Sequence, residues 1–277
     1  ALLDGLRGVA ALLVVWYHVF EGYQFASGSA IIQEINHGYL AVDFFFILSG
    51  FVIGYAYDDR WNRMSTGTFF KRRLIRLQPM VIMGSIVGAA LFWFQDAPCY
   101  PAMEGVSAGA VLLVMLLGCT LLPLPLKWDV RGWMEMHPLN GPAWSLYYEY
   151  IGNILYALFI RKFSKTALTV LVAIAACFTV HRCLTAPAGD IVGGWALNWE
   201  QQYVGLVRLM YPFFGGLLLS RLGWLIRTRK NAFGWCSLMI IAVLSAPRIG
   251  GEDGYWMNGL YEAFCIICIF PVIVSMG

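Results

Sequence analysis

The sequence predicts an all-α membrane protein, a polytopic bundle of transmembrane helices. Of its 277 residues, 60% are hydrophobic and only 13% are charged, whereas soluble domains carry about a quarter charged residues. Long apolar runs follow one another along the chain with charged breaks between them, which is typical of a multi-pass protein. The net charge of +3 is small. It gives no reason to expect a nucleic-acid partner, and the placement of the positive residues predicts topology instead.

About nine apolar segments have spanning length. They cover residues 6–22, 39–57, 77–94, 106–122, 144–160, 166–184, 204–222, 233–248 and 257–276. We expect them to form one transmembrane domain over residues 1–277, trimmed at both ends, since the chain starts without Met and stops inside an apolar run. The seven cysteines show neither the grouping of zinc ligands nor a disulfide framework, and no cluster of metal ligands is visible.

Positive charge between the runs predicts which loops face the cytoplasm. The Arg- and Lys-rich stretches 58–76, 161–165 and 221–230 are expected inside, and the loop 95–105 outside. With 58–76 and 161–165 both inside, the run 106–122 has to begin and end on the same face. Either it is re-entrant or lies on the outer surface, or one charge cluster violates the rule; we favour a re-entrant or interfacial segment.

Ionisable residues inside a membrane need a partner or water, so each is a candidate for function. The first run holds two of them, Arg7 and His18. Their spacing is about three helical turns, or roughly 16 Å, so both lie on one face of a helix. Arg7 is then expected at the inner interface and His18 well inside the bilayer. The structural alternative is an arginine that snorkels to the interface and a histidine that bonds to a neighbouring helix.

The second run carries Asp43 one turn inside its outer end, with Gly50 and Gly54 further along. A lone carboxylate at that position needs a cationic or hydrogen-bond donor partner. The alternative is that Asp43 caps the outer end of its helix. The two glycines form a small-xxx-small pair, which lets a second helix approach closely.

The fifth run follows the residues Asn140, Gly141 and Pro142, which are typical of a helix start. It places Glu149 two turns into an apolar helix, where a glutamate is expected to be protonated or paired. His18 is the partner that we predict, because a helix entering from outside carries Glu149 to a similar depth. A cluster of inter-helix hydrogen bonds is the structural alternative.

Three arginines, Arg72, Arg73 and Arg76, lie beside the third run at its cytoplasmic end. Positive-inside signalling explains them in part. Guanidinium groups bind phosphate through two-point hydrogen bonding, so the cluster also predicts a phosphate-binding site.

Taken together, these residues make the chain similar to the acyltransferase 3 family of integral-membrane acyltransferases. The resemblance covers nearly the whole chain and rests on four stretches in family order: LDGLRGVAALLVVWYH (3–18), VDFFFILSGFVI (42–53), FFKRRLIRLQP (69–79) and WSLYYE (144–149). The family's essential His and the Arg before it match His18 and Arg7. Its R-x-x-R, associated with the acyl-CoA side, matches Arg73 and Arg76, and its W-S-L-x-x-E ends at Glu149.

The resemblance implies an enzyme of the bacterial inner membrane that moves an acyl group, usually acetyl, from cytoplasmic acyl-CoA to a hydroxyl group. The acceptor implied is a cell-envelope or extracellular carbohydrate or a lipid-linked glycan, and the other partners are membrane lipids. No metal is needed, because a thioester is already activated. Many family members continue W-S-L-x-x-E with a second acidic or amide residue and an aromatic pair. Here YIGN (150–153) follows, so only Glu149 is carried over.

For this reaction we expect His18 to be the general base, because a neutral imidazole accepts a hydroxyl proton near pH 7. Glu149 or Asp43 would hold its tautomer and stabilise the imidazolium. Arg7 would stabilise the developing oxyanion or hold the phosphates of the donor. Direct attack by the acceptor is our first choice, and a covalent acyl-enzyme on His18 is the alternative.

The rival class is a membrane transporter or exporter of a glycan or small polar substrate, without acyl transfer. Its intramembrane polar face would look similar, but the sequence shows no internal repeat of the kind that many transporters have. A scaffolding membrane protein leaves His18 and Glu149 unexplained. Consumption of a thioester separates the enzyme from both of these classes.

Overall fold

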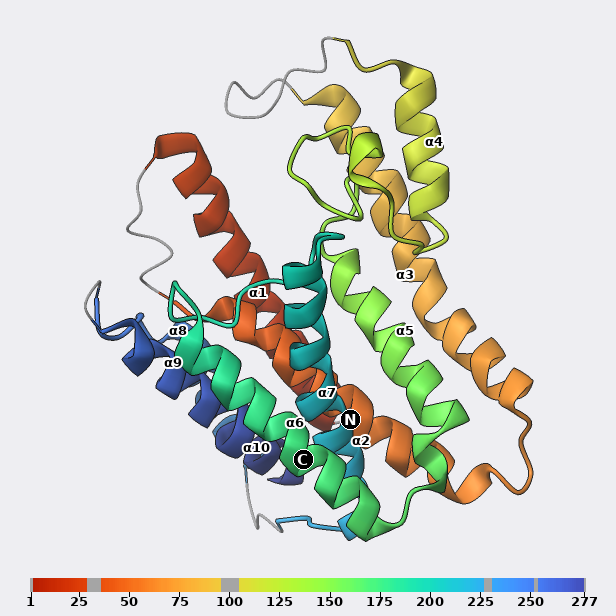
Figure 1. The fold of residues 1–277 in the computed structure, drawn as a ribbon, viewed down its shortest axis with the longest axis vertical. Helices are drawn as coiled ribbons and strands as arrows, with labels where there is room; N and C mark the ends of the chain where they lie inside the picture. Colours follow the sequence, from red (N-terminus) through yellow and green to blue (C-terminus); the bar gives the residue numbers. More distant parts are fainter. Residues whose placement is uncertain (1, 29–35, 96–104, 227–230, 252–253, 277) are drawn as a thin grey trace. The chain divides into compact units, whose positions relative to one another are not determined.

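The computed structural model describes residues 2–28, 36–95, 105–226, 231–251 and 254–276. These residues contain helices and no β-strand, which confirms the predicted fold class (Figure 1). Six helical stretches of the described chain are long and apolar enough to cross a membrane: Leu2–Gln24, Gly38–Arg60, Thr66–Phe94, Lys165–Thr185, Trp199–Leu222 and Tyr255–Met276. The predicted number of about nine spanning segments is therefore not confirmed.

The contacts divide the chain into two compact units, and the first comprises residues 1–60, 160–192 and 207–277. It holds α1 (Leu2–Ser27), α2 (Ala41–Tyr57), α6 (Lys165–Thr185), the later part of α7 (Trp199–Leu222), α8 (Ala232–Ser245), α9 (Tyr255–Phe264) and α10 (Phe270–Met276). A π-helical turn, Cys265–Ile269, joins α9 to α10, and α9 packs along α6 (Figure 1). The 3-10 turns Gly38–Leu40, Asp58–Arg60 and Ile160–Lys162 complete this unit.

Glycines bring α2 and α7 into backbone contact within the first unit. A Cβ atom on Gly50 would lie 1.7 Å from the carbonyl oxygen of Phe213, and one on Gly216 would lie 2.0 Å from that of Ile47. Gly54 approaches the same helix one turn further along. The close helix contact predicted from Gly50 and Gly54 is therefore confirmed, and α7 is the partner.

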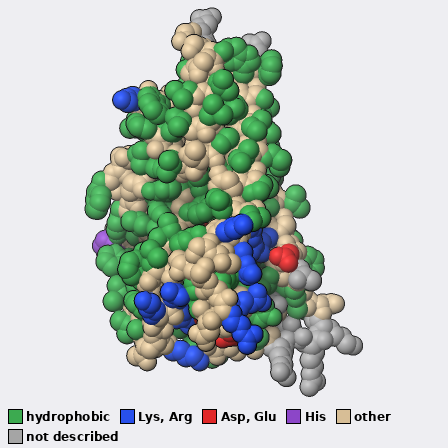
Figure 2. Space-filling view, turned by 90° about the vertical axis from the view of Figure 1, so that its right-hand side faces the viewer, with side chains coloured by type: hydrophobic (Ala, Val, Ile, Leu, Met, Phe, Trp, Pro, Cys, Tyr) green, Lys and Arg blue, Asp and Glu red, His purple; other side chains and the backbone are tan. Residues whose placement is uncertain are grey.

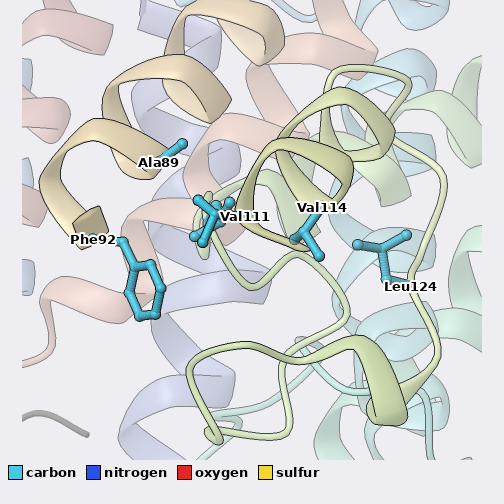
Figure 3. Close-up of a cluster of buried hydrophobic side chains, with 6 residues drawn as sticks. Ala89, Phe92, Val111, Val114 and Leu124 are labelled. Carbon is cyan, nitrogen blue, oxygen red and sulfur yellow. The ribbon is translucent and has the colours of Figure 1, made fainter. Parts of the chain in front are cut away.

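The second unit comprises residues 61–159 and 193–206. It holds α3 (Thr66–Phe94), α4 (Ala108–Gly118), the 3-10 turn Leu126–Trp128, α5 (Ala143–Leu158) and the first turns of α7. α3 packs against both α4 and α5. Figure 3 shows a hydrophobic cluster in which side chains from α3 and α4 meet those of the following segment: Ala89, Phe92, Val111, Val114, Leu124 and Leu139.

The helix α3 begins well before the apolar run 77–94 that predicts it. Ser65 is its N-cap, and the hydroxyl of this serine accepts a hydrogen bond of 3.2 Å from the backbone N–H of Thr68. The arginines 72, 73 and 76 therefore belong to the same helix as the apolar run. A hydropathy window misses these first turns because they are polar.

The run 106–122 gives only the 11-residue helix α4. At 1.5 Å per residue this helix is about 16 Å long, roughly half of the hydrocarbon thickness. Its end lies beside the middle of α3, where a Cβ atom on Gly118 would lie 3.2 Å from the Oγ atom of Ser85. The chain then returns along α3, and the carbonyl oxygen of Leu139 lies against Gly88. The placement of this run as a re-entrant or interfacial segment stays a prediction.

The sidedness of the loops stays a prediction. Most of the loop 95–105 and the basic residues 227–230 lie outside the described residues. The expectation of one transmembrane domain over residues 1–277 likewise stays a prediction.

We expect Gly50→Ala to lower the melting temperature of the purified protein in detergent, because the added methyl group has to push α2 and α7 apart. Overpacking of this kind typically costs about 1–3 kcal/mol. Gly234→Ala in α8 is the matched control, since no atom lies within 4 Å of a Cβ atom there and alanine favours helix over glycine. Equal melting temperatures for the two variants would contradict the contact.

Candidate active site

His18 lies in the later half of α1 and is half exposed, with 51% of its side chain accessible. Its Nδ1 atom lies 2.7 Å from Oε2 of Glu21, one turn further along the same helix. The hydroxyl of Tyr17 lies 3.5 Å from Oε1 of the same carboxylate. Glu21 is thus the carboxylate that accompanies His18. The sequence carries a signal for it, because residues three apart on a helix are neighbours.

Arg7 lies near the start of α1 and forms an ion pair with Asp4, 3.0 Å between Nη1 and Oδ1. Because α1 is one continuous helix from Leu2 to Ser27, Arg7 and His18 lie on one face of it, as their spacing predicts. The cation and the imidazole therefore stand about three turns apart along that face.

Asp43 pairs with Arg208, whereas the sequence predicts a role for it beside His18. Asp43 is fully buried in the first unit. Its two carboxylate oxygens accept hydrogen bonds from Arg208 of α7, at 2.7 Å from Nη2 and 3.3 Å from Nε. The same Nη2 atom also donates to the carbonyl oxygen of Tyr39 at 2.8 Å. This buried two-point ion pair holds α7 to α2.

Glu149 pairs with Arg73, whereas His18 is the partner that the sequence predicts. One carboxylate oxygen of Glu149 on α5 lies 2.5 Å from Nη2 of Arg73 on α3, and the two side chains are 13% and 2% exposed. The amide of Asn153 donates to the backbone carbonyl of Glu149 at 2.6 Å. The expected pairing of this glutamate is confirmed, but its partner is a cation of the same unit, which links α3 to α5.

The three arginines of α3 differ in their exposure to solvent. Arg73 is turned toward Glu149, while Arg72 and Arg76 are exposed, as is Lys71. Figure 2 shows several Lys and Arg side chains on the visible face, where many side chains are hydrophobic. The part of the predicted cluster that can meet a soluble phosphate is therefore Arg72 and Arg76, with Lys71 beside them.

Two further buried charged residues are not predicted as candidates, although they too are ionisable residues inside apolar runs, as His18 is. One is Arg208, the partner of Asp43. The other is Glu262 in α9, which is fully buried. Its carboxylate accepts hydrogen bonds from the Tyr39 hydroxyl at 2.5 Å and the Ile191 N–H at 2.7 Å, and a third from Asn258 at 2.9 Å. Glu262 is the one charged residue of the run 257–276, and Arg208 lies in the run 204–222, which has a second arginine only at its end.

His137 has no comparable sequence signal, because it lies outside the apolar runs, in the segment between α4 and α5. It is buried, and burial lowers its pKa to about 4, so the ring is neutral at pH 7. The ring packs against Tyr147, with 6.2 Å between the centroids. Neither of its nitrogens has a hydrogen-bond partner among the described residues.

These features define a multi-pass membrane protein with an exposed imidazole–carboxylate pair on one apolar helix and an exposed basic surface at the start of another. Within the described part of the chain, no group of three or more His, Cys, Asp or Glu side chains could hold a metal ion. The available groups suit proton transfer and the binding of an anionic ligand.

Comparison with known proteins places the chain in a family. The model of the family described as Acyltransferase domain matches residues 1–277. The chain is 32% identical over 163 residues to Protein 2 in picA locus of Rhizobium radiobacter, a match that covers 56% of this chain and 80% of that protein. It is 29% identical over 166 residues to Acyltransferase MdmB of Streptomyces mycarofaciens, covering 59% and 40% of the two chains. No solved structure matches it significantly.

A third relative, from Staphylococcus aureus (strain COL), carries the name "Putative O-acetyltransferase" and is 37% identical over 93 residues, or 32% of this chain and 13% of that protein. The chain thus spans less than half the length of two of these three relatives. The chain belongs to the acyltransferase 3 family and is an acyltransferase. This membership decides between the two predicted classes in favour of the enzyme.

Proposed function

We propose that the protein transfers an acyl group, with acetyl as the first candidate, from cytoplasmic acyl-CoA to a hydroxyl group of a cell-envelope or extracellular carbohydrate. The observation that carries this proposal is the half-exposed imidazole of His18 on an apolar helix. An ionisable side chain on an apolar helix is costly in a membrane, so it is a candidate for function. In an acyltransferase, that function would be transfer of the acceptor's proton. We place the enzyme in the bacterial inner membrane.

In the proposed reaction, the acceptor hydroxyl donates a hydrogen bond to Nε2 of His18. As its oxygen attacks the carbonyl carbon of the thioester, the proton passes to the imidazole and the carbonyl becomes an oxyanion. The C–S bond then breaks, and the coenzyme A thiolate takes the proton from the imidazolium. The products are an ester and coenzyme A. Arg7 lies about three helical turns from His18 on the same helix, so it is proposed as the alternative site for the donor phosphates rather than as the partner of this oxyanion.

The phosphates of the donor are proposed to bind at the exposed arginines of α3. Arg72 and Arg76 present guanidinium groups whose planar fork suits two-point binding of phosphate. Arg73 is proposed to fix the position of α3 through its ion pair with Glu149. This division modifies the expectation from the family motif, in which Arg73 and Arg76 act together.

We predict that His18→Ala abolishes acyl transfer while the protein still inserts at normal levels. Removal of a general base typically lowers turnover by about 10²- to 10⁴-fold. The measurement is thiol release from acetyl-CoA by the purified protein, with surface polysaccharide from the source cells as the acceptor. His181→Ala, which removes an exposed histidine of α6, is the control and should keep full turnover. Wild-type turnover in His18→Ala would disprove the proposed base.

We predict that Arg76→Lys raises the KM for acetyl-CoA roughly 5- to 10-fold and leaves kcat nearly unchanged, because it removes two-point phosphate binding but keeps the charge. Arg73→Lys should instead lower the melting temperature, since its guanidinium is buried against Glu149. Arg63→Lys, at another exposed arginine of the stretch 58–76, is the control. If Arg72→Lys and Arg76→Lys both leave the KM unchanged, these arginines only orient the chain, and the phosphates have to be sought at Arg7.

A further inference from the structure

We infer that Glu21 is the positioning residue of His18. Its carboxylate accepts a hydrogen bond from the Nδ1–H group of the imidazole, which leaves the Nε2 lone pair to take the proton of the acceptor. The inference rests on the proposed function, in which His18 is the base. It assigns to Glu21 the role that the sequence analysis gives to Asp43 or Glu149.

The geometry of the pair fixes the tautomer. The Nδ1 atom of His18 and Oε2 of Glu21 are 2.7 Å apart. An ionised carboxylate only accepts hydrogen bonds, so the proton of a neutral imidazole has to be on Nδ1. Nε2 makes no hydrogen bond to the described residues, and half of the ring is accessible. The nitrogen that carries the lone pair is thus the one that a hydroxyl can reach.

The carboxylate also lies near Tyr17, whose hydroxyl is 3.5 Å from Oε1 of Glu21, at the long limit of a hydrogen bond. Tyr17 is buried and packs edge to face on Tyr39, with 5.7 Å between the ring centroids. Its Cβ would lie 2.4 Å from a Cβ atom on Gly38, so the backbone of the neighbouring turn closely confines it. Both contacts are made by the 3-10 turn Gly38–Leu40 of the first unit, which is not part of α1.

The other two carboxylates are engaged elsewhere. Asp43 is bound by Arg208 at 2.7 Å, and Glu149 is bound by Arg73 at 2.5 Å. Glu21 differs from both because its partners among the described residues are an imidazole and a phenol rather than a guanidinium. Its carboxylate is therefore available to the imidazolium that forms when His18 accepts the proton.

Loss of this carboxylate should lower kcat and leave donor binding intact. In the serine-protease triad, replacing the aspartate lowers kcat about 10⁴-fold because the wrong tautomer forms. The His18–Glu21 pair is partly exposed, at 51% and 27%, where water replaces some of the lost interaction. We therefore expect a fall in kcat of roughly 10- to 100-fold, smaller than in the triad, with the KM for acetyl-CoA changed less than about twofold.

The test compares Glu21→Leu, Glu21→Gln and Glu21→Asp in the purified full chain. Thiol release from acetyl-CoA gives kcat and KM, and ¹⁵N spectra of histidine-labelled protein report the tautomer of His18, assigned by its loss in His18→Ala. We expect kcat to fall in Glu21→Leu and Glu21→Gln and to recover in part in Glu21→Asp. The ¹⁵N signals should show the Nδ1–H form in the wild type and a shift toward Nε2–H in Glu21→Leu. Glu200→Gln, the same change at an exposed glutamate of α7, should alter neither readout.

The outcomes separate this inference from the proposed function. If His18→Ala keeps its turnover, the proposed base is wrong. If His18→Ala is inactive but both Glu21→Leu and Glu21→Gln keep wild-type kcat, the base stands and the role of Glu21 is refuted. A lower kcat with an unchanged His18 tautomer in Glu21→Leu also refutes it. Should Glu21→Leu fail to fold, Glu21→Gln, which keeps the size of the side chain, decides by the same two readouts.

Discussion

A charge in apolar surroundings needs a partner, and two ion pairs between helices supply one for four of the buried charged side chains described. Arg208 and Asp43 join α7 to α2, and Arg73 and Glu149 join α3 to α5. Breaking such a pair by removing one partner typically destabilises a protein by about 3–5 kcal/mol, because it leaves an uncompensated buried charge. The ion pairs therefore fix which helix faces meet within each unit, and the close glycine contacts of α2 and α7 follow from the same alignment.

This constraint also sorts ionisable residues by function. A carboxylate that is bound by a buried guanidinium cannot also serve as the partner of a base. The same ion pair turns the guanidinium of Arg73 away from the exposed surface on which Arg72 and Arg76 lie. The groups that we propose for chemistry are the pair of His18 and Glu21 on α1 and the exposed cations at the start of α3. His18 and Glu21 both lie on α1, and the exposed arginines Arg72 and Arg76 both lie on α3.

The sequence predicts those features that depend on one segment at a time. Hydropathy predicts the helical membrane class, the run 106–122 is recognised as unusual from the charge of its flanks, and Gly50 with Gly54 predicts a close helix contact. Which residue pairs with a buried charge depends on three-dimensional packing. The sequence therefore predicts that Glu149 is paired, but it does not predict Arg73 as the partner. Arg208 is missed for a different reason: a single arginine in an apolar run resembles a topology signal unless its depth is considered.

The central claim is acyl transfer to a surface carbohydrate with His18 as the base, and the most direct measurement is NMR of surface glycans from the source cells. Three strains are compared: one with the gene, one without it, and one in which the His18→Ala variant restores expression. The account predicts O-acetyl methyl signals in the first strain and their loss in the other two. Identical glycan spectra from all three strains would contradict it.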